Sequence, residues 1–186
     1  MRVIAGSARG RRLKTLEGMD VRPTTDKVKE AIFSAIQFDL PDAAVLDLFA
    51  GSGQIAAECL SRGAVRAVMC DNSREAAQAI VENFAKLGEK PELYKCEYSA
   101  CLRALVGAKF DLVYVDPPYK SGVYNDVLTS VVSLGLLADD GEIVCEHVAE
   151  FPLPQQIVGL VAYKSRKVGT VMFTFYRKAT DEDIQA

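Results

Sequence analysis

Short apolar runs alternate with amphipathic segments along most of this chain. The apolar runs that predict strands occupy residues 45–49, 67–70, 93–96, 112–115 and 142–146. The segments between them have apolar residues three and four positions apart, the spacing of one buried helix face; they follow the first strand, span residues 74–87 and surround 102–105. Because right-handed crossovers place helices on both faces of a parallel sheet, this alternation predicts an α/β fold with a doubly wound, mostly parallel sheet.

The carboxyl-terminal part predicts the remaining strands. Residues 157–163 and 171–176 form two more apolar runs, and the polar stretch 164–169 separates them. Two such runs with a short polar connection favour a closing antiparallel pair. The sheet is therefore expected to contain seven strands.

The amino-terminal part follows a different pattern. Gly6, Gly10 and Gly18 interrupt short extended pieces, which is typical of a small hairpin. A helix is expected next, from a cap at Thr24 or Thr25 to about residue 38. We expect a single unit with three parts: an extension over residues 1–40, a core over 41–180 and a tail over 181–186.

That helix has one apolar face at the three-and-four spacing, formed by Val28, Ala31, Ile32, Ala35 and Ile36. The charged residues Lys27, Lys29 and Glu30 fall outside this face, so we expect their side chains in solvent.

Charge is distributed unevenly along the chain. The net charge is −3, but residues 1–29 hold eight basic and three acidic residues, so this stretch carries +5 and the remainder −8. A basic arm on an acidic body indicates contact with nucleic acid. The alternative is a solvated basic face without a partner.

Several classes of protein are excluded by composition. No apolar run approaches the roughly 18 residues of a membrane span, and arginines follow the first residues where a signal peptide would be apolar, so a cytoplasmic protein is expected. The five cysteines contain no Cys-x-x-Cys pair and are interpreted as reduced, buried residues. His147 is the only histidine, which leaves little for a metal site or a Ser-His-Asp triad.

A glycine loop follows the first predicted strand. Asp47 lies within that strand, and Gly51 and Gly53 precede a helix, the position where doubly wound sheets bind ligands. The loop also fits a relaxed dinucleotide-binding pattern, and Asp71 follows at a suitable distance to accept hydrogen bonds from ribose hydroxyls. A site for an NAD-type cofactor is therefore an alternative. Asp47 favours a cationic ligand over a pyrophosphate; S-adenosylmethionine has a sulfonium, an amino group and a ribose for Asp71. Asp47 as a structural buried acid is the alternative.

The most specific feature is the segment that follows the fourth strand. Two prolines force the chain to turn after Asp116, which presents its carboxylate at the carboxyl edge of the sheet. A carboxylate and the Pro117 carbonyl could accept hydrogen bonds from the amino group of a nucleobase and stabilise the positive charge that develops during methyl transfer. Tyr119 could stack on the base. A plain structural turn would need neither the acid nor the aromatic ring.

Together, the loop from Asp47 to Gly53 and the segment from Asp116 to Tyr119 resemble class I S-adenosylmethionine-dependent amino-methyltransferases with a Rossmann-like fold. The stretches 1–6, 10–13 and 22–30 are similar to the amino end of the bacterial RsmD-type 16S rRNA guanine-N2 methyltransferases. This resemblance covers essentially the whole chain.

The resemblance implies methyl transfer from S-adenosylmethionine to N2 of one guanine in 16S rRNA, on the assembling small subunit, by a protein that we expect to be a monomer without a metal. The implied catalytic residues are Asp116, Pro117 and Tyr119. The implied cofactor residues are Asp47, Phe49, Gly51, Gly53, Asp71, Asn72, Ser99 and Asp116. The candidate RNA contacts are Arg9, Arg11, Arg12 and Arg22.

The chain departs from the family pattern at two places. Tyr98 and Ser99 stand where the family usually has an acidic residue near the adenine, which makes Ser99 only a candidate. Val168 and Gly169 stand where a Tyr-Gly pair is usual. The alternatives are another DNA or RNA amino-methyltransferase, an NAD-dependent oxidoreductase and a non-enzymatic ribosome-assembly factor.

Overall fold

The computed structural model describes residues 1–16, 26–118 and 121–185. Its helices are α1 (Asp26–Ile36), α2 (Gln54–Ser61), α3 (Arg74–Leu87), α4 (Tyr98–Ala104), α5 (Tyr124–Ser133) and α6 (Asp181–Gln185). Its strands are β1 (Ala44–Asp47), β2 (Arg66–Cys70), β3 (Glu92–Tyr94), β4 (Phe110–Val115), β5 (Leu137–Val148), β6 (Gln156–Ile157), β7 (Leu160–Val168) and β8 (Val171–Lys178).

All the named strands join one sheet in the order β3-β2-β1-β4-β5-β8-β7-β6. The first five pair in parallel, and β5, β8, β7 and β6 pair antiparallel. The order in which strands are added reverses at β1: β2 and β3 lie on one side of β1, and β4 lies on the other. The doubly wound, mostly parallel α/β fold is confirmed.

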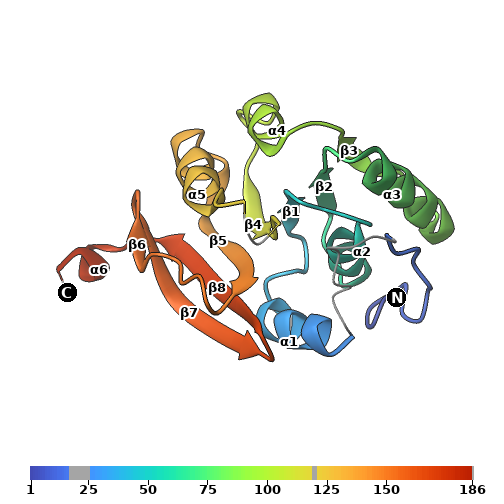
Figure 1. Cartoon of the computed structure of the whole chain (residues 1–186), viewed down its shortest axis with the longest axis horizontal. Coiled ribbons are helices and arrows are strands. Elements are labelled where there is room, and N and C mark those ends of the chain that lie inside the picture. The colour runs from blue at the N-terminus through green and yellow to red at the C-terminus, as the bar shows by residue number, and fades with distance from the viewer. Residues whose placement is uncertain (17–25, 119–120, 186) are drawn as a thin grey trace.

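Helices cover both faces of this sheet (Figure 1). The apolar side chains of α4 and α5 pack on one face, against residues such as Val113 and Ile143. Those of α1, α2 and α3 pack on the other face in two further clusters, which contain Leu112 and Met69. The central strand β4 is buried on both faces, which explains its nearly continuous apolar sequence.

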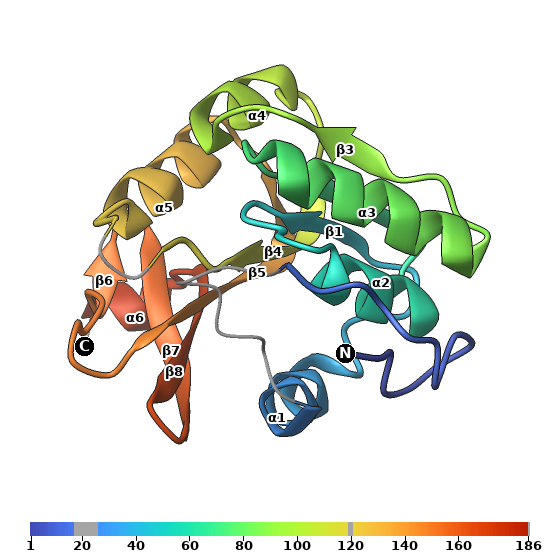
Figure 2. The same cartoon turned by 45° about the vertical axis from the view of Figure 1, so that its right-hand side comes forward.

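The amino-terminal segment forms the expected hairpin. Its two arms are joined at Arg2 and Arg12 by an antiparallel bridge, with hydrogen bonds from the Val3 amide to the Arg11 carbonyl and from the Gly10 amide to the Val3 carbonyl. Figure 2 shows this segment running beside α2. The predicted caps Thr24 and Thr25 lie outside the described residues.

The number of strands differs from the prediction. The apolar run 157–163 is split, because Val158 and Gly159 both have positive φ, at 47° and 76°, and reverse the chain between β6 and β7. The sheet therefore has eight strands in the described part of the chain. The polar stretch after Tyr163 extends β7 rather than forming a connection, since its side chains lie on the solvent side of an outer strand.

The expectation that Lys29 faces solvent was wrong. Its side chain is fully buried between the hairpin, α1 and α2, where it donates to the carbonyl of Arg2 and meets the carboxylate of Glu58. The apolar periodicity of α1 could not reveal this burial, because the partners come from distant segments.

Among the described residues, no helix is both long enough and apolar enough to span a membrane.

Candidate active site

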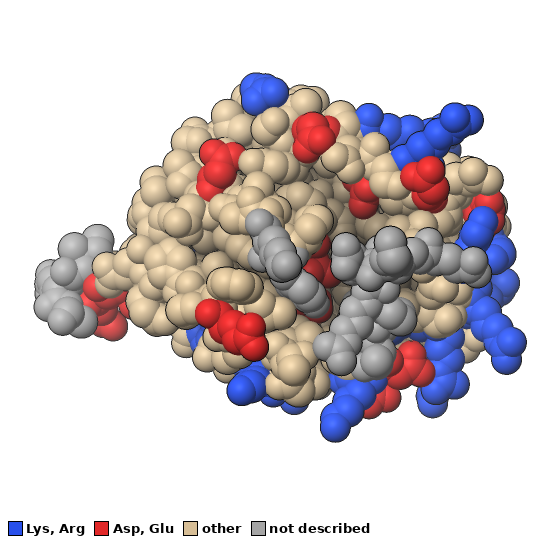
Figure 3. Space-filling view, viewed as in Figure 1, with Lys and Arg blue, Asp and Glu red and all other residues tan. Residues whose placement is uncertain are grey.

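Four carboxylates gather at the carboxyl edge of the parallel strands. Asp47 ends β1, Asp71 follows β2, Asp116 follows β4, and Glu146 lies near the end of β5. These strands are neighbours in the order β2-β1-β4-β5, and ligands of doubly wound sheets bind at this edge. Figure 3 shows acidic side chains at the centre of the corresponding face.

Asp47 has the strongest need for a further partner. Its side chain is only 1% exposed, and its Oδ2 atom has no hydrogen-bond partner in the described part of the protein. Burial and, to a smaller extent, the nearby charge of Asp71 raise the pKa of Asp47 to about 7, against the backbone hydrogen bonds from Ala56 and Phe49. A cation beside Asp47 would relieve both penalties.

Asp116 and Glu146 share this acidic environment. Burial raises the pKa of Asp116 well above its ordinary value, with contributions from the charges of Glu146 and Asp47. Burial also raises the pKa of Glu146, which the hydrogen bond from the Tyr114 hydroxyl, 2.5 Å long, partly offsets. A cation placed among these carboxyl groups would offset the burial and the mutual repulsion that raise their pKa values.

The glycine loop is tied to the end of β2. The Gly51 amide donates to Oδ2 of Asp71 at 2.8 Å, and the Ser73 amide donates to Oδ1 at 2.9 Å. A carboxylate has about four acceptor positions, so Asp71 keeps acceptor capacity for a ligand's hydroxyl groups. Burial raises the pKa of Asp71, against these two bonds.

The two glycines of the loop have different physical roles. Both have positive φ, 53° at Gly51 and 75° at Gly53. A Cβ on Gly53 would lie 3.1 Å from side-chain atoms of Ile80 and Phe84, so Gly53 lets the loop pack tightly on α3. Among the described residues, a Cβ on Gly51 would meet only Leu16, at 4.0 Å, so on this side the position is open to a ligand.

The amino-terminal extension reaches the same loop. The buried side chain of Asn83 on α3 donates to the carbonyls of Lys14 and Ser52, both at 2.9 Å, and accepts from the Lys14 amide. The segment that leaves the hairpin is thus tied through Asn83 to the glycine loop.

The start of α4 forms another wall of the site. The rings of Phe49 and Tyr98 are 5.6 Å apart and tilted by 44°, which places α4 against the turn after β1. Ser99 is the next residue of α4 and is half-buried. Asn72 is exposed, and its amide donates to the carboxylate of Glu97 at 2.6 Å.

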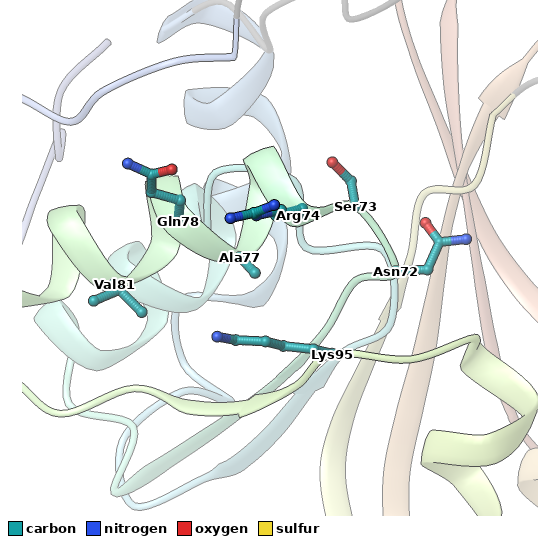
Figure 4. Close-up of a pocket in the computed structure, with 7 residues that line it drawn as sticks. All are labelled: Asn72, Ser73, Arg74, Ala77, Gln78, Val81 and Lys95. Carbon is teal, nitrogen blue, oxygen red and sulfur yellow. The ribbon is translucent and has the colours of Figure 1, made fainter.

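A depression of about 400 Å³ adjoins the turn after β2 (Figure 4). Asn72 and Ser73 connect it to Asp71, whereas Arg74 at the start of α3 and Lys95 after β3 give it a basic lining. It therefore adjoins the carboxylate cluster at Asp71 but lacks its acidic character.

The remaining residues predicted for catalysis and RNA binding do not all lie at the carboxylate cluster. Pro117 is buried directly after Asp116. Tyr119 and Arg22 lie outside the described residues. Arg9, Arg11 and Arg12 are exposed on the hairpin, and the guanidinium of Arg11 donates to the carbonyl of Lys86 at the far end of α3.

Sequence reasoning did not assign Glu146 and Tyr114 to the site. The available signal was an acid between the apolar stretch 143–145 and the end of β5, which must find a polar partner when buried. His147 is buried with both ring nitrogens hydrogen bonded, to Thr174 and to the carbonyl of Val148, as expected for a packing residue.

The doubly wound sheet, with carboxylates at its carboxyl edge, has the Rossmann-like fold of the methyltransferase structures to which this chain is similar. The chain belongs to the family described as conserved hypothetical protein 95, which matches residues 1–177.

Individual relatives agree with this family. YlbH of Bacillus subtilis (strain 168) is 37% identical over 182 residues, which cover 96% of this chain and 99% of that protein. Ribosomal RNA small subunit methyltransferase D of Escherichia coli (strain K12) is 30% identical over 186 residues, 100% of this chain and 94% of that protein. The solved structure of yhhF from Escherichia coli has a TM-score of 0.85 at 32% identity, over 96% of this chain and 97% of that one. The similarity to the RsmD family is confirmed.

Proposed function

We propose that this protein transfers a methyl group from S-adenosylmethionine to N2 of one guanine in 16S rRNA, on the assembling small subunit. The carboxylate cluster around the buried Asp47 carries the proposal, because it calls for a cationic ligand. The name of the Escherichia coli relative, a small-subunit rRNA methyltransferase, supports the choice of substrate.

The residues of the site fit the proposed cofactor. The orphaned Oδ2 of Asp47 would accept from the amino group of S-adenosylmethionine, and Asp71 would accept from its ribose hydroxyls. The open position at Gly51 leaves room beside the loop, and Phe49, Asn72 and Ser99 would border the adenosine. When bound, this cofactor supplies an electrophilic methyl group on a positively charged sulfur.

Asp116 and Pro117 would hold the target. The amino nitrogen of guanine has its lone pair delocalised into the ring, so it is a weak nucleophile. Hydrogen bonds from this amino group to the Asp116 carboxylate and the Pro117 carbonyl would favour a pyramidal nitrogen with its lone pair directed at the methyl group. The Asp116 charge would also stabilise the positive charge that develops on nitrogen, and the proton leaves afterwards. We assign base stacking to Tyr119.

The amino-terminal extension, residues 1–40, would bind RNA. The exposed Arg9, Arg11 and Arg12 would contact phosphates, which position RNA without reading its sequence. Arg22 is assigned to the same role.

An NAD-type cofactor at the glycine loop has less support than S-adenosylmethionine. A pyrophosphate on the glycine loop would lie close to the charges of Asp47 and Asp71, and each phosphate would add to an already unfavourable negative potential.

The test is transfer of labelled methyl from S-adenosylmethionine to small subunits from a strain that lacks this gene. The expected product is N2-methylguanosine at one 16S site, identified by mass spectrometry of the digested RNA. Transfer to a different base would refute the assignment of the target. Cofactor binding without transfer to subunits or to protein-free 16S rRNA would refute the substrate.

A further inference from the structure

A second basic surface lies between α1 and the end of β7. This groove has a volume of about 510 Å³ and is lined by side chains from both elements. The lining includes Lys27, Glu30, Ser34, Arg166 and Lys167. Figure 3 shows lysines and arginines along the lower margin of the face that has acidic residues at its centre.

Three lining side chains, Lys27, Arg166 and Lys167, are basic and one, Glu30, is acidic; Lys164 of β7 reaches α1 beside this lining. Lys27, Lys164, Arg166 and Lys167 are exposed, and none forms an ion pair with an acidic residue within 1–16, 26–118 or 121–185. By contrast, two cations of the amino-terminal segment have acidic partners, since Arg2 pairs with Asp26 and Lys14 with Glu82. Unpaired cations in one groove of a chain with negative net charge favour an anionic partner.

Two of these cations are held in fixed positions. The Arg166 guanidinium donates to the Ser34 hydroxyl at 2.8 Å, and the Lys164 ammonium donates to the Ala35 carbonyl at 3.3 Å above the Phe175 ring. Both groups retain unused N–H donors. Such preorganisation lowers the entropic cost of binding a phosphate.

The groove opens at the same sheet edge as the carboxylate cluster. Val168, the last residue of β7, pairs with Val171, which pairs with Val148 at the carboxyl end of β5. β7 is three strands from β4 in the sheet, about 14 Å across it, and Val148 lies three residues beyond Cys145, the partner of Val115, so the two strand ends are about 17 Å apart. By comparison, Arg11 touches the far end of α3, about 20 Å along that helix from Ser73.

We propose that the groove between α1 and β7 binds backbone phosphates of the RNA strand that flanks the target nucleotide. The inference rests on the proposed function and adds a second contact surface to the amino-terminal arginines. The substrate strand would then pass over the acidic site with its phosphates on the basic margin, which resolves the conflict between a polyanionic substrate and a negatively charged active site.

The test compares two triple variants of the full chain. The groove variant is Lys27→Gln/Arg166→Gln/Lys167→Gln. The control is Lys90→Gln/Arg103→Gln/Lys109→Gln. It removes the same charge at exposed positions near the amino ends of the parallel strands, opposite the carboxylate cluster. Binding to protein-free 16S rRNA is measured against salt concentration, and methyl transfer is measured on unmethylated small subunits. S-adenosylmethionine affinity verifies that both variants are folded.

The groove variant is expected to bind 16S rRNA about tenfold or more weakly, and the slope of log K against log salt is expected to fall by about 2, since each lost single-strand phosphate contact removes about 0.7. KM for subunits should rise while kcat at saturation stays near the wild-type value. The control should keep the wild-type slope.

Three results would overturn the inference: a wild-type slope in the groove variant, an equal loss in the control, or a loss confined to subunits with unchanged binding to protein-free rRNA, which would indicate a ribosomal protein as the partner. Absence of methyl transfer by the wild-type protein would refute the proposed function instead, because the RNA-binding comparison does not depend on catalysis.

Discussion

The ammonium of Lys29 and the carboxylate of Glu58 lie 3.6 Å apart, and both side chains are fully buried between α1 and α2. Glu58 also accepts from the amides of Ile4 and Ala5, both at 2.9 Å, and from the guanidinium of Arg62 at 3.0 Å. This one carboxylate therefore attaches the amino-terminal hairpin to the helix that follows the glycine loop.

Replacement of Glu58 is expected to be far more damaging than replacement of Lys29. Glu58→Gln leaves a buried ammonium without its counter-charge, which costs about 3–5 kcal/mol of unfolding free energy. Lys29→Met should cost less, because Glu58 keeps Arg62 and two backbone amides, and because burial already lowers the pKa of Lys29. Urea denaturation of both variants measures the difference, and equal losses would contradict this account.

Gly6 and Gly10 provide a matched pair of substitutions in the hairpin. Both have positive φ, 78° and 84°, so alanine introduces similar backbone strain at each. At Gly6, however, the new Cβ would lie 1.7 Å from the Ser61 carbonyl oxygen, whereas at Gly10 no described residue lies within 4 Å. Gly6→Ala should therefore detach the hairpin from α2.

Limited proteolysis with trypsin measures that detachment. Cleavage at Arg9, Arg11 and Arg12 is expected to accelerate in Gly6→Ala and to stay near the wild-type rate in Gly10→Ala. Similar rates in the two variants would mean that the contact with Ser61 does not hold the hairpin.

Much of the fold could be predicted because the parallel strands and long helices carry strong apolar periodicity. The expected helix over residues 74–87 matches α3 at both ends. The helix α5 was not anticipated, although its buried residues follow the helical spacing 124, 127, 128 and 131, because its valines and threonine favour strands in isolation. The packing of α5 on the sheet face formed by β4 and β5 overrides that preference.

The site was less predictable than the fold. Asp47, Asp71 and Asp116 occupy strand ends, and strand ends of a parallel sheet meet at one edge, so their proximity follows from topology. The burial of Glu146 and Lys29 depends on partners far away in the chain, which no local pattern contains.

Asp47→Asn tests the cationic ligand and has a defined pH dependence. The folded protein keeps Asp47 protonated up to about pH 7, whereas an unfolded aspartate ionises near pH 4. The unfolded state therefore loses its proton first, and the contribution of Asp47 to the stability of the ligand-free protein should fall between about pH 4 and 7 and then level off. Asp47→Asn should flatten this decline, as measured by urea denaturation across that range.

The same variant should lose affinity for S-adenosylmethionine. A hydrogen bond to a charged group contributes about 1.5–3 kcal/mol, so the dissociation constant should rise about 10- to 100-fold. In the wild-type protein a bound cation favours ionised Asp47, and affinity should increase as the pH rises through about 7. Calorimetry at several pH values compares the two proteins, and an Asp47→Asn profile parallel to wild type would exclude this role.

Asp116→Asn should separate catalysis from cofactor binding. The amide retains the shape and an acceptor oxygen but removes the charge that faces the reacting nitrogen, so kcat should fall about 100- to 1,000-fold. The affinity for S-adenosylmethionine should change little, since Asp47 and Asp71 remain. Asp140→Asn, at an exposed position of β5, is the matched control and should keep full activity. Single-turnover transfer to unmethylated small subunits measures the chemical step; a wild-type rate in Asp116→Asn would show that this carboxylate does not stabilise the transition state.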